Sequence, residues 1–301
     1  MKIGIVILNY LNWKDTVDCI ESLFLQTDQE FEMVVVDNYS KNETVKILTE
    51  KYQDLKNFHL IETKENLGFA KGNNVGLRYC IRDLKVNNVL VINNDVIFTD
   101  KEYIHKLKQL PLNNNIGAYG TKIIGLDGLN QNPLKFNPGP YEVLREYLFP
   151  IIKNLKNTSL YRSFKKTKNT PNVSENKTRL SNEGYSNYIL HGSVLYFTQN
   201  YLSILEGFYP ETFLYYEENI LGLLFKKIGL EMEYIDNLEI LHKEDQSSSL
   251  SFNNESGVKY RFGRESVKIA LKVLLLSLNR IKKITNNYSY NYEVIVSNKS
   301  K

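Results

Sequence analysis

Residues 66–76 read Asn-Leu-Gly-Phe-Ala-Lys-Gly-Asn-Asn-Val-Gly, and residues 89–95 read Val-Leu-Val-Ile-Asn-Asn-Asp after a helix-length interval. An apolar run of β-favouring residues that stops at amides and a carboxylate predicts a buried strand with polar groups at its carboxyl end. In open α/β sheets, ligands bind at that edge. We therefore expect Asp95 to face a cleft, with the glycine-rich segment bringing backbone close to the same ligand. A carboxylate beside a glycine-rich turn suits a phosphate ligand bound through a metal ion.

The first half of the chain alternates between strand and helix patterns. Apolar runs predict strands at Ile3–Leu8, Glu32–Val36, Phe58–Glu62, Val89–Ile92 and Ile116–Tyr119. Amphipathic periodicity predicts helices between them, at Trp13–Leu25, Thr44–Tyr52 and Ala70–Leu84. This alternation is typical of an α/β fold with a mainly parallel central sheet and right-handed crossovers.

After Asp127 the alternation breaks, and prolines mark irregular chain. The polar, Lys- and Asn-rich stretch Lys153–Asn182 predicts a mobile segment. Ordered elements are expected again as a strand at Tyr188–Phe197, a helix at Tyr215–Ile228 with Gly229 as its C-cap, and a strand at Glu231–Ile235.

The composition is that of a soluble globular protein, with 42% apolar and 24% charged residues and a net charge of +4. The basic charge is concentrated, because Lys153–Asn182 and Lys259–Lys283 each carry eight basic residues and one acidic residue. Such segments favour an anionic partner, such as a membrane surface or a phosphorylated acceptor. Nucleic acid is excluded as the expected partner, since the sequence holds no nucleic-acid-binding motif.

The C-terminal stretch Ser266–Ile284 predicts a basic amphipathic helix. Such a helix can lie on an anionic membrane surface or dock on the core of its own domain, and the pattern leaves both open. Cys19 and Cys80 have no partner at metal-binding spacing, which indicates buried free thiols in a reducing compartment. We therefore expect a cytoplasmic protein, with peripheral association at the inner face of the cytoplasmic membrane as a further hypothesis.

Polar residues end three of the predicted strands. Asp37 follows the second strand, and a carboxylate there can accept hydrogen bonds from a nucleobase or ribose. Asn9 and Tyr10 end the first strand in the same way. For Asp37 taken alone, a helix N-cap or an Asx-turn would be the commoner explanation, and Asn9 and Tyr10 have the same ambiguity between a structural and a functional role. Their shared position at one sheet edge favours a binding site.

Four more residues have side chains suited to chemistry. Asp95 can anchor Mg²⁺ or Mn²⁺, with phosphates and water completing the coordination shell, and His242 can complete such a site. Adjacent carboxylates at Glu217 and Glu218 cannot share one helix face, so one can act as a general base while the other binds another group. The alternative for this pair is a favourable interaction with the helix dipole.

Together these segments resemble the inverting family 2 glycosyltransferases with a GT-A fold, a Rossmann-like sandwich, and especially bacterial rhamnosyltransferase-like members. The resemblance covers Lys2 to Ser249. Its pieces are Val35–Ser40, Asn66–Gly76, Asn93–Asp95, Phe213–Leu221 and His242–Ser248.

The resemblance implies roles for individual residues. Asp37, Asn9 and Tyr10 would contact the nucleotide, while Asn93 and Asn94 would line the donor site ahead of the metal ligand. Asp95 would be the last residue of a DXD-type motif that binds a divalent metal, Mn²⁺ or Mg²⁺, and His242 would approach the metal or diphosphate. The residues that would border the nucleotide sugar are Gly68, Phe69, Lys71 and Asn74. Glu218 would be the catalytic base, with Glu217 as the next candidate.

The activity implied is transfer of a sugar (rhamnose, a hexose or an N-acetylhexosamine) from a nucleoside-diphosphate donor to a saccharide hydroxyl with inversion. The expected context is bacterial surface polysaccharide such as capsule or O-antigen, with a lipid-linked acceptor as one hypothesis. Residues 1–125 would form the nucleotide-sugar half, residues 126–255 the acceptor half with its mobile segment 153–182, and residues 256–301 the basic amphipathic tail.

Two other functions stay open on the sequence. A nucleotidyltransferase also pairs an α/β nucleotide domain with a metal-binding carboxylate, but it would have a glycine-rich basic loop after the first strand, where this chain reads Leu8-Asn9-Tyr10-Leu11. A non-catalytic nucleotide-sugar-binding or scaffold protein is the second alternative. It is kept open because Asn93 stands where a fuller DXD motif has its first acid.

Overall fold

The structure is a computed structural model of the chain, and it describes residues 1–111, 113–136, 139–153, 188–243 and 256–297. The basic stretch Lys153–Asn182 lies outside the described residues except for its first residue, and so does most of His242–Ser248. The expectation of a mobile segment at residues 153–182 therefore stays a prediction.

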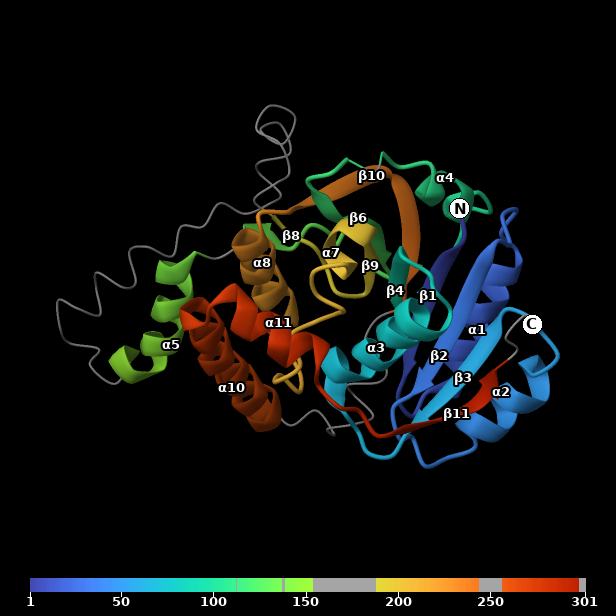
Figure 1. Cartoon of the computed structure of the whole chain (residues 1–301), viewed down its shortest axis with the longest axis horizontal. Helices are drawn as coiled ribbons and strands as arrows, with labels where there is room; N and C mark the ends of the chain where they lie inside the picture. Colours follow the sequence, from blue (N-terminus) through green and yellow to red (C-terminus); the bar gives the residue numbers. More distant parts are fainter. Residues whose placement is uncertain (112, 137–138, 154–187, 244–255, 298–301) are drawn as a thin grey trace.

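Within the described residues, a nine-stranded mixed sheet forms the centre of the molecule (Figure 1). The strand order across it is β11-β3-β2-β1-β4-β9-β6-β10-β5. The strand bounds are β1 Ile3–Asn9, β2 Phe31–Asp37, β3 Phe58–Thr63, β4 Val89–Asn93, β5 Val96–Ile97, β6 Ile116–Gly125, β9 Val194–Phe197, β10 Glu231–His242 and β11 Tyr292–Ser297. A separate small sheet pairs β7 (Lys135–Phe136) with β8 (Tyr188–Ile189).

Strands β3, β2, β1 and β4 are parallel neighbours. Strand β9 runs antiparallel between β4 and β6, and β10 pairs parallel with β6. Strands β5 and β11 are antiparallel additions at the two edges. The α/β fold class is therefore confirmed, with a parallel N-terminal half and a mixed sheet overall.

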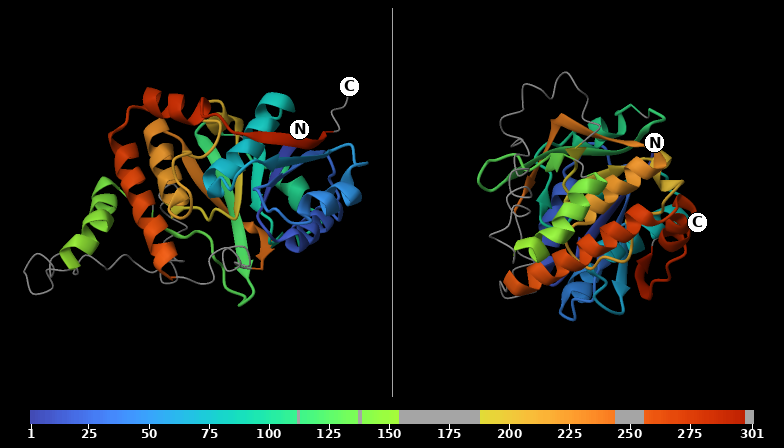
Figure 2. Two further views of the ribbon diagram at one scale, coloured as in Figure 1. Left: turned by 90° about the horizontal axis from the view of Figure 1, so that it is seen from below. Right: turned by 90° about the vertical axis from the view of Figure 1, so that its left-hand side faces the viewer.

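Helices cover both faces of the sheet, which explains why its central strands are apolar on both sides. One face carries the buried side chains of α3, α7, α8, α10 and α11, and the other carries those of α1, α2 and α4. Helix α5 packs on α10 at one end of the sheet, as Figure 2 shows. The helix bounds are α1 Trp13–Phe24, α2 Thr44–Tyr52, α3 Gly68–Arg78, α4 Tyr103–Lys108, α5 Pro140–Lys153, α7 Gln199–Leu202, α8 Glu217–Ile228, α10 Ser256–Leu275 and α11 Leu278–Asn286.

Several predicted elements differ from those observed. The strand expected at Ile116–Tyr119 extends to Gly125 as β6. The helix expected over Ala70–Leu84 is α3 followed by the π-helical turn η1 (Tyr79–Asp83). The strand expected over Tyr188–Phe197 is divided into β8 and β9, because the chain turns between them. The strand expected to end at Ile235 continues as β10, because pairing with β6 resumes after an irregularity in the register.

The C-terminal region is not the single helix predicted for Ser266–Ile284. Two helices, α10 and α11, are separated at Ser277, whose side chain accepts a hydrogen bond from the backbone of Arg280 as an N-cap. Ala270 and Ile281 are fully buried in the core, so both helices dock on the chain's own domain. After them β11 extends the sheet beside β3. Docking on the core is therefore observed, and membrane binding stays a prediction.

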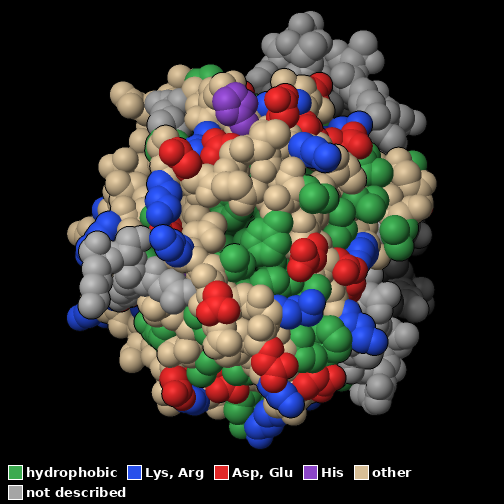
Figure 3. All heavy atoms as spheres, turned by 90° about the vertical axis from the view of Figure 1, so that its right-hand side faces the viewer, with side chains coloured by type: hydrophobic (Ala, Val, Ile, Leu, Met, Phe, Trp, Pro, Cys, Tyr) green, Lys and Arg blue, Asp and Glu red, His purple; other side chains and the backbone are tan. Residues whose placement is uncertain are grey.

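Strands of the one sheet come from all three predicted regions, residues 1–125, 126–255 and 256–301. These regions are therefore parts of a common scaffold, and the separate functions expected for them stay predictions. The described side chains in Figure 3 show acidic and basic groups intermixed on one face of the molecule. That face offers no patch of a single sign within the part of the chain that is described.

Both cysteines are buried and free, as predicted. Burial raises the pKa of the Cys19 and Cys80 thiols, because desolvation disfavours the thiolate. These thiols behave as small core residues.

Candidate functional site

Three parallel strands end in polar residues at one edge of the sheet. The register pairs Asn9 with Asp37 and Leu8 with Asn93, so β1, β2 and β4 end at the same level. Because parallel strands present their carboxyl ends together, the loops after them meet at this edge. The prediction that these strands bring polar groups to one edge is confirmed.

Asn9 connects the loops that follow these strands. Its amide nitrogen donates to Asp37 Oδ1 at 2.7 Å, and its oxygen accepts from Thr16 Oγ1 at 2.8 Å and from Asn94 Nδ2 at 3.3 Å. Asn94 also donates to the carbonyl of Asn12 at 2.9 Å. Asn9 has no exposed surface and Asn94 has little, so the structure places both in supporting positions behind the loops. Their contact with a donor stays a prediction.

Asp37 is also buried, with 1% of its surface exposed. Burial raises the pKa of its carboxyl, while hydrogen bonds from the backbone and hydroxyl of Ser40 and from Asn9 act in the opposite direction. Asp37 thereby holds the turn after β2. Its predicted contact with the nucleobase stays a prediction.

The loops after β1 and β2 contain strained backbone. Leu11, Tyr39 and Lys41 have φ angles of 65°, 66° and 52°, a region that non-glycine residues rarely occupy. Ser40 Oγ accepts a hydrogen bond from the backbone of Leu11 at 2.8 Å, which joins the two loops. Tyr10 lies half-buried beside them. Such strain persists where surrounding structure enforces it, and it clusters at ligand sites.

The start of α3 is tied to the second loop and to the segment before α8. Asn38 Oδ1 accepts from the backbone of Leu67 at 2.9 Å, and Asn38 Nδ2 donates to the carbonyl of Gly68 at 3.2 Å. Gly68 has a φ of 74°, and a Cβ there would lie 2.1 Å from the carbonyl oxygen of Phe213. Gly68 therefore allows the backbone of α3 to approach the backbone of Phe213 closely. The sequence pattern had predicted that these glycines bring the backbone close to a ligand.

The other three α3 residues that were predicted to border the sugar each make a different contact within the protein. Phe69 packs edge-on against Phe208, with ring centroids 5.6 Å apart. The Lys71 ammonium lies 5.9 Å from the ring centroid of Tyr288. Asn74 has no exposed surface, and its amide is occupied by structural hydrogen bonds to the backbone of Phe208 and the hydroxyl of Tyr290. Asn74 is thus held in structural contacts, and its contact with the donor sugar stays a prediction.

Asp95 and His242 are brought together from opposite ends of the sequence. Asp95 follows β4 and His242 ends β10, and the antiparallel pairing of β10 with β5 puts Asp95 Oδ1 3.3 Å from His242 Nε2. Neither atom has a hydrogen-bond partner among the described residues, although both are buried. Gln131 Oε1 lies 2.8 Å from His242 Nδ1, where it can accept a hydrogen bond from an N–H. In the neutral ring that carries its hydrogen on Nδ1, the lone pair of Nε2 is on the side of the carboxylate.

These two atoms suit a divalent metal ion. A carboxylate oxygen and an imidazole nitrogen are common ligands of Mn²⁺, and a hydrogen bond to the second ring nitrogen is typical of a metal-binding histidine. Within the described residues, no group of three or more His, Cys, Asp and Glu side chains could hold a metal ion. A metal ion held by this pair would need further ligands, which a phosphate and water can supply.

His191 was not predicted as a site residue, and it lies beside this pair. Its ring centroid is 5.6 Å from that of His242 at an interplanar angle of 70°. Burial lowers the pKa of His191 to about 4, and the neighbouring His242 acts in the same direction. His191 Nδ1 accepts a hydrogen bond from the backbone of Ser193 at 3.1 Å. The only signal in the sequence was a His-Gly-Ser interruption within an apolar strand pattern.

Glu217 and Glu218 occupy different environments at the start of α8. Tyr215 and Tyr216 before them have φ angles of 68° and 73°, which turn the chain into the helix. Burial raises the pKa of Glu217 to about 8, and the charge of Glu218 adds to the effect. Glu218 is half-buried, and its Oε1 would lie 2.7 Å from a Cβ built on Gly192. Glu218 therefore lies against the same turn that carries His191.

Much of the chain matches one known protein family. Residues 4–174, more than half of the chain, match the model of Glycosyl transferase family 2. The chain belongs to this family.

This glycosyltransferase is similar to the low-salt glycan biosynthesis hexosyltransferase Agl10 of Haloferax volcanii, with 30% identity over 138 residues. The match covers 46% of this chain and 41% of that protein, so the chain matches less than half of the length of this relative.

Solved structures share its GT-A fold. The mannosyltransferase PcManGT from Pyrobaculum calidifontis, in complex with GDP-Man and Mn²⁺, has a TM-score of 0.52 and 14% identity, and the match covers 95% of this chain and 73% of that one. S. aureus TarS 1–349 in complex with UDP-GlcNAc has a TM-score of 0.55 and 16% identity, with coverages of 95% and 71%. At these identities the likeness shows the fold. Among the described helices, none is both long and apolar enough to cross a membrane.

Proposed function

We propose that this family 2 glycosyltransferase transfers a hexose-type sugar from a nucleoside-diphosphate donor to a saccharide hydroxyl, with inversion at the anomeric carbon. The observation that carries the proposal is the turn between β8 and β9. His191 on this turn faces the Asp95–His242 pair, and the neighbouring Gly192 faces Glu218. The Asp95–His242 pair, which would bind a metal-bound diphosphate, is thus next to His191. The proposed base Glu218 is next to the following residue, Gly192.

Asp95 and His242 are the residues that would hold a divalent metal ion. The ion supplies positive charge that neutralises a diphosphate leaving group. The Mn²⁺ in the PcManGT complex supports this choice of metal. Gln131 contacts His242 Nδ1 and can orient its ring, and half-buried His191, whose pKa is lowered to about 4, packs beside His242 without adding charge at neutral pH.

Glu218 is the proposed general base. It would accept the proton of an acceptor hydroxyl, whose oxygen then attacks the anomeric carbon from the face opposite the diphosphate. A single displacement of this kind inverts that centre. Glu217 is not suited to the role at neutral pH, because burial raises its pKa to about 8 and keeps its carboxyl protonated. The close approach of Glu218 to Gly192 needs the absence of a side chain there.

The donor and acceptor classes rest on the relatives. The GDP-Man and UDP-GlcNAc complexes of PcManGT and TarS support a nucleoside-diphosphate hexose or N-acetylhexosamine, and the name of Agl10 supports a role in glycan assembly. We further propose a bacterial surface polysaccharide as product, rhamnose as one donor sugar to be tested, and a lipid-linked acceptor reached from the cytoplasmic face of the membrane. The basic side chains of α10 and α11 support that location.

The experiment measures sugar transfer from donor to acceptor by the Glu218→Gln variant, with Glu217→Gln as the matched control. Loss of a general base costs about 10²–10⁴ in rate, so Glu218→Gln should lose transfer while its donor affinity, measured by thermal shift, stays unchanged. Glu217→Gln should retain activity, because an amide resembles the protonated acid. Loss of donor binding in Glu218→Gln, or normal turnover by it, would contradict the assignment of the base.

The donor is identified with a panel of UDP-, GDP- and dTDP-sugars in thermal-shift experiments, with and without Mn²⁺. Asp95→Ala should remove the dependence of donor binding on Mn²⁺. Unchanged Mn²⁺-dependent affinity in that variant would exclude Asp95 as a ligand. Stabilisation by nucleotide sugars without any turnover would favour the non-catalytic binding protein.

A further inference from the structure

A second cleft lies away from the Asp95–His242 pair, between the end of α3, η1 and the segment that joins α11 to β11. Its volume is about 430 Å³, within the range of small-molecule pockets. Three tyrosines, Tyr288, Tyr290 and Tyr292, line it together with polar side chains that include Asn287 and Ser289. The described residues that line it include no aliphatic side chain. Neither the family nor the proposed donor site accounts for this lining.

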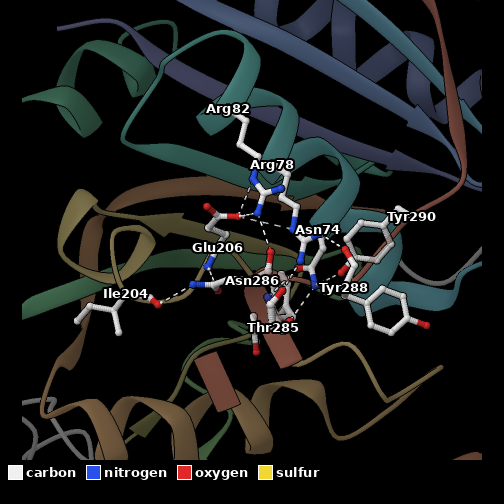
Figure 4. A network of polar contacts seen from close by, with 10 residues as sticks. Asn74, Arg78, Arg82, Ile204, Glu206, Thr285, Asn286, Tyr288 and Tyr290 are labelled. Atoms are coloured by element: carbon white, nitrogen blue, oxygen red, sulfur yellow. Dashed lines mark hydrogen bonds and ion pairs between the residues drawn. The ribbon is translucent and has the colours of Figure 1, made fainter. Parts of the chain in front are cut away.

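The two arginines of the cleft are occupied by internal contacts, as Figure 4 shows. Arg78 donates to the backbone carbonyls of Thr285 and Tyr288. Arg82 donates to Glu206 at 2.8 Å from Nε and to the carbonyl of Asn286 at 2.7 Å. Three of these contacts hold the last turn of α11 and the residue Tyr288 beyond it, and Glu206 pairs with Arg82. The cleft consequently offers little to a phosphate or another strong anion.

The tyrosine rings are held in place by these contacts. Tyr290 lies between Arg78, whose guanidinium carbon is 4.5 Å from the ring centroid, and Tyr288, whose ring centroid is 5.0 Å away. The Tyr290 hydroxyl accepts a hydrogen bond from Asn74 at 3.0 Å. The hydrogen bond from Arg78 to the Tyr288 carbonyl also holds the backbone that carries the Tyr288 ring. Rings held in this way lose little conformational entropy when a ligand binds.

We propose that this cleft is a binding subsite for neutral saccharide residues, separate from the donor site. The carbon–hydrogen faces of a pyranose ring stack on aromatic rings, and amide and hydroxyl side chains such as Asn287 and Ser289 match sugar hydroxyls. Phe69, a residue predicted to border the donor sugar, lies at the start of α3, and Arg78 of the cleft lies at its end. Nine residues at 1.5 Å each put Phe69 and Arg78 about 14 Å apart along the helix. A glycan could therefore be held at a distance from the point of transfer.

The test measures saccharide binding by saturation-transfer NMR, first without nucleotide and then with saturating UDP, GDP and dTDP together with Mg²⁺ to occupy the donor site. The probes are methyl glycosides of glucose, galactose, mannose, rhamnose and N-acetylglucosamine, and the disaccharides cellobiose and maltose. At least one probe should bind the wild-type protein. Tyr288→Ala should weaken that binding about fivefold, as expected for loss of one ring contact. Tyr260→Ala, at a tyrosine that is 58% exposed on α10, is the matched control and should bind normally.

Ser289→Trp is a second variant at an exposed position, where a new ring would fill the cleft without removing a structural contact. It should also abolish saccharide binding. Absence of binding by every probe, or normal binding by both Tyr288→Ala and Ser289→Trp, would overturn the proposal. Binding that these nucleotides displace would assign the saccharide to the donor site and overturn it as well.

The identification of the bound saccharide with the acceptor rests on the proposed function, whereas saccharide binding itself does not. If transfer is confirmed, Tyr288→Ala should raise KM for an oligosaccharide acceptor and leave KM for the donor unchanged. The NMR experiment needs no turnover. Failure of the subsite and failure of the proposed transferase activity are therefore distinguishable.

Discussion

The substitution Gly68→Ala tests whether the start of α3 must lie against the segment that leads to Glu218. Gly68 has a φ of 74°, and the new Cβ would lie 2.1 Å from the carbonyl oxygen of Phe213 and 2.8 Å from its carbonyl carbon. Because Phe213 contributes backbone and not a flexible side chain, one of the two segments must move. The backbone hydrogen bond from Phe69 to Phe213, now 2.9 Å long, would be lost or lengthened.

The cost has two parts. A left-handed backbone conformation costs a residue with a Cβ about 1–2 kcal/mol. Forcing extra volume into a close contact adds about 1–3 kcal/mol. We therefore expect Gly68→Ala to lower the free energy of unfolding by about 2–5 kcal/mol, and to lower transfer activity because the displaced segment carries Glu218.

Gly128→Ala is the matched control, since Gly128 has a φ of 77° but nothing within 4 Å of its added Cβ. Both variants are compared with the wild type by urea unfolding followed by circular dichroism. Gly128→Ala should show only the conformational cost of about 1–2 kcal/mol and normal activity. Equal destabilisation by the two substitutions would refute the close approach of α3 and the Phe213 segment as the reason for Gly68.

Three other predictions follow from buried groups. Burial raises the pKa of Glu217 from 4.5 to about 8, so the folded protein keeps a proton that the unfolded chain releases, and stability should fall as pH rises between these values. In urea unfolding, the stability of Glu217→Gln should fall less than that of the wild type over this pH range. An equal fall in both proteins would contradict the raised pKa of Glu217. Cys19 and Cys80, whose thiol pKa values are raised by burial, should react with a thiol reagent only after unfolding, so rapid labelling of the native protein would count against their burial. Asn74→Ala removes hydrogen bonds to Phe208 and Tyr290 and should cost about 2–4 kcal/mol in urea unfolding, whereas a change below about 0.5 kcal/mol would show that they contribute little.

The sequence by itself determined the first half of the fold. Apolar runs such as Val34–Val36 are buried on both faces, and a run with this pattern has no stable alternative to a covered parallel strand. The polar residues that end β1, β2 and β4 were also predictable, because the end of an apolar run shows where a strand leaves the core. Asp95 and His242 were predicted from their positions after strands, and Glu217 and Glu218 from the start of a helix. Their roles stay predictions.

Only the tertiary structure decided which of these residues meet. Asp95 and His242 are 147 positions apart in the chain, and the pairing of β10 with β5 brings them together. His191 was overlooked because its neighbours are contributed by other strands, and the turn that exposes it interrupts an apolar pattern. The difference between Glu217 and Glu218 likewise depends on burial, which adjacent positions on a helix do not reveal. Local sequence fixes periodicity and caps, whereas the relative positions of distant side chains depend on strand order and register, which only the packed sheet defines.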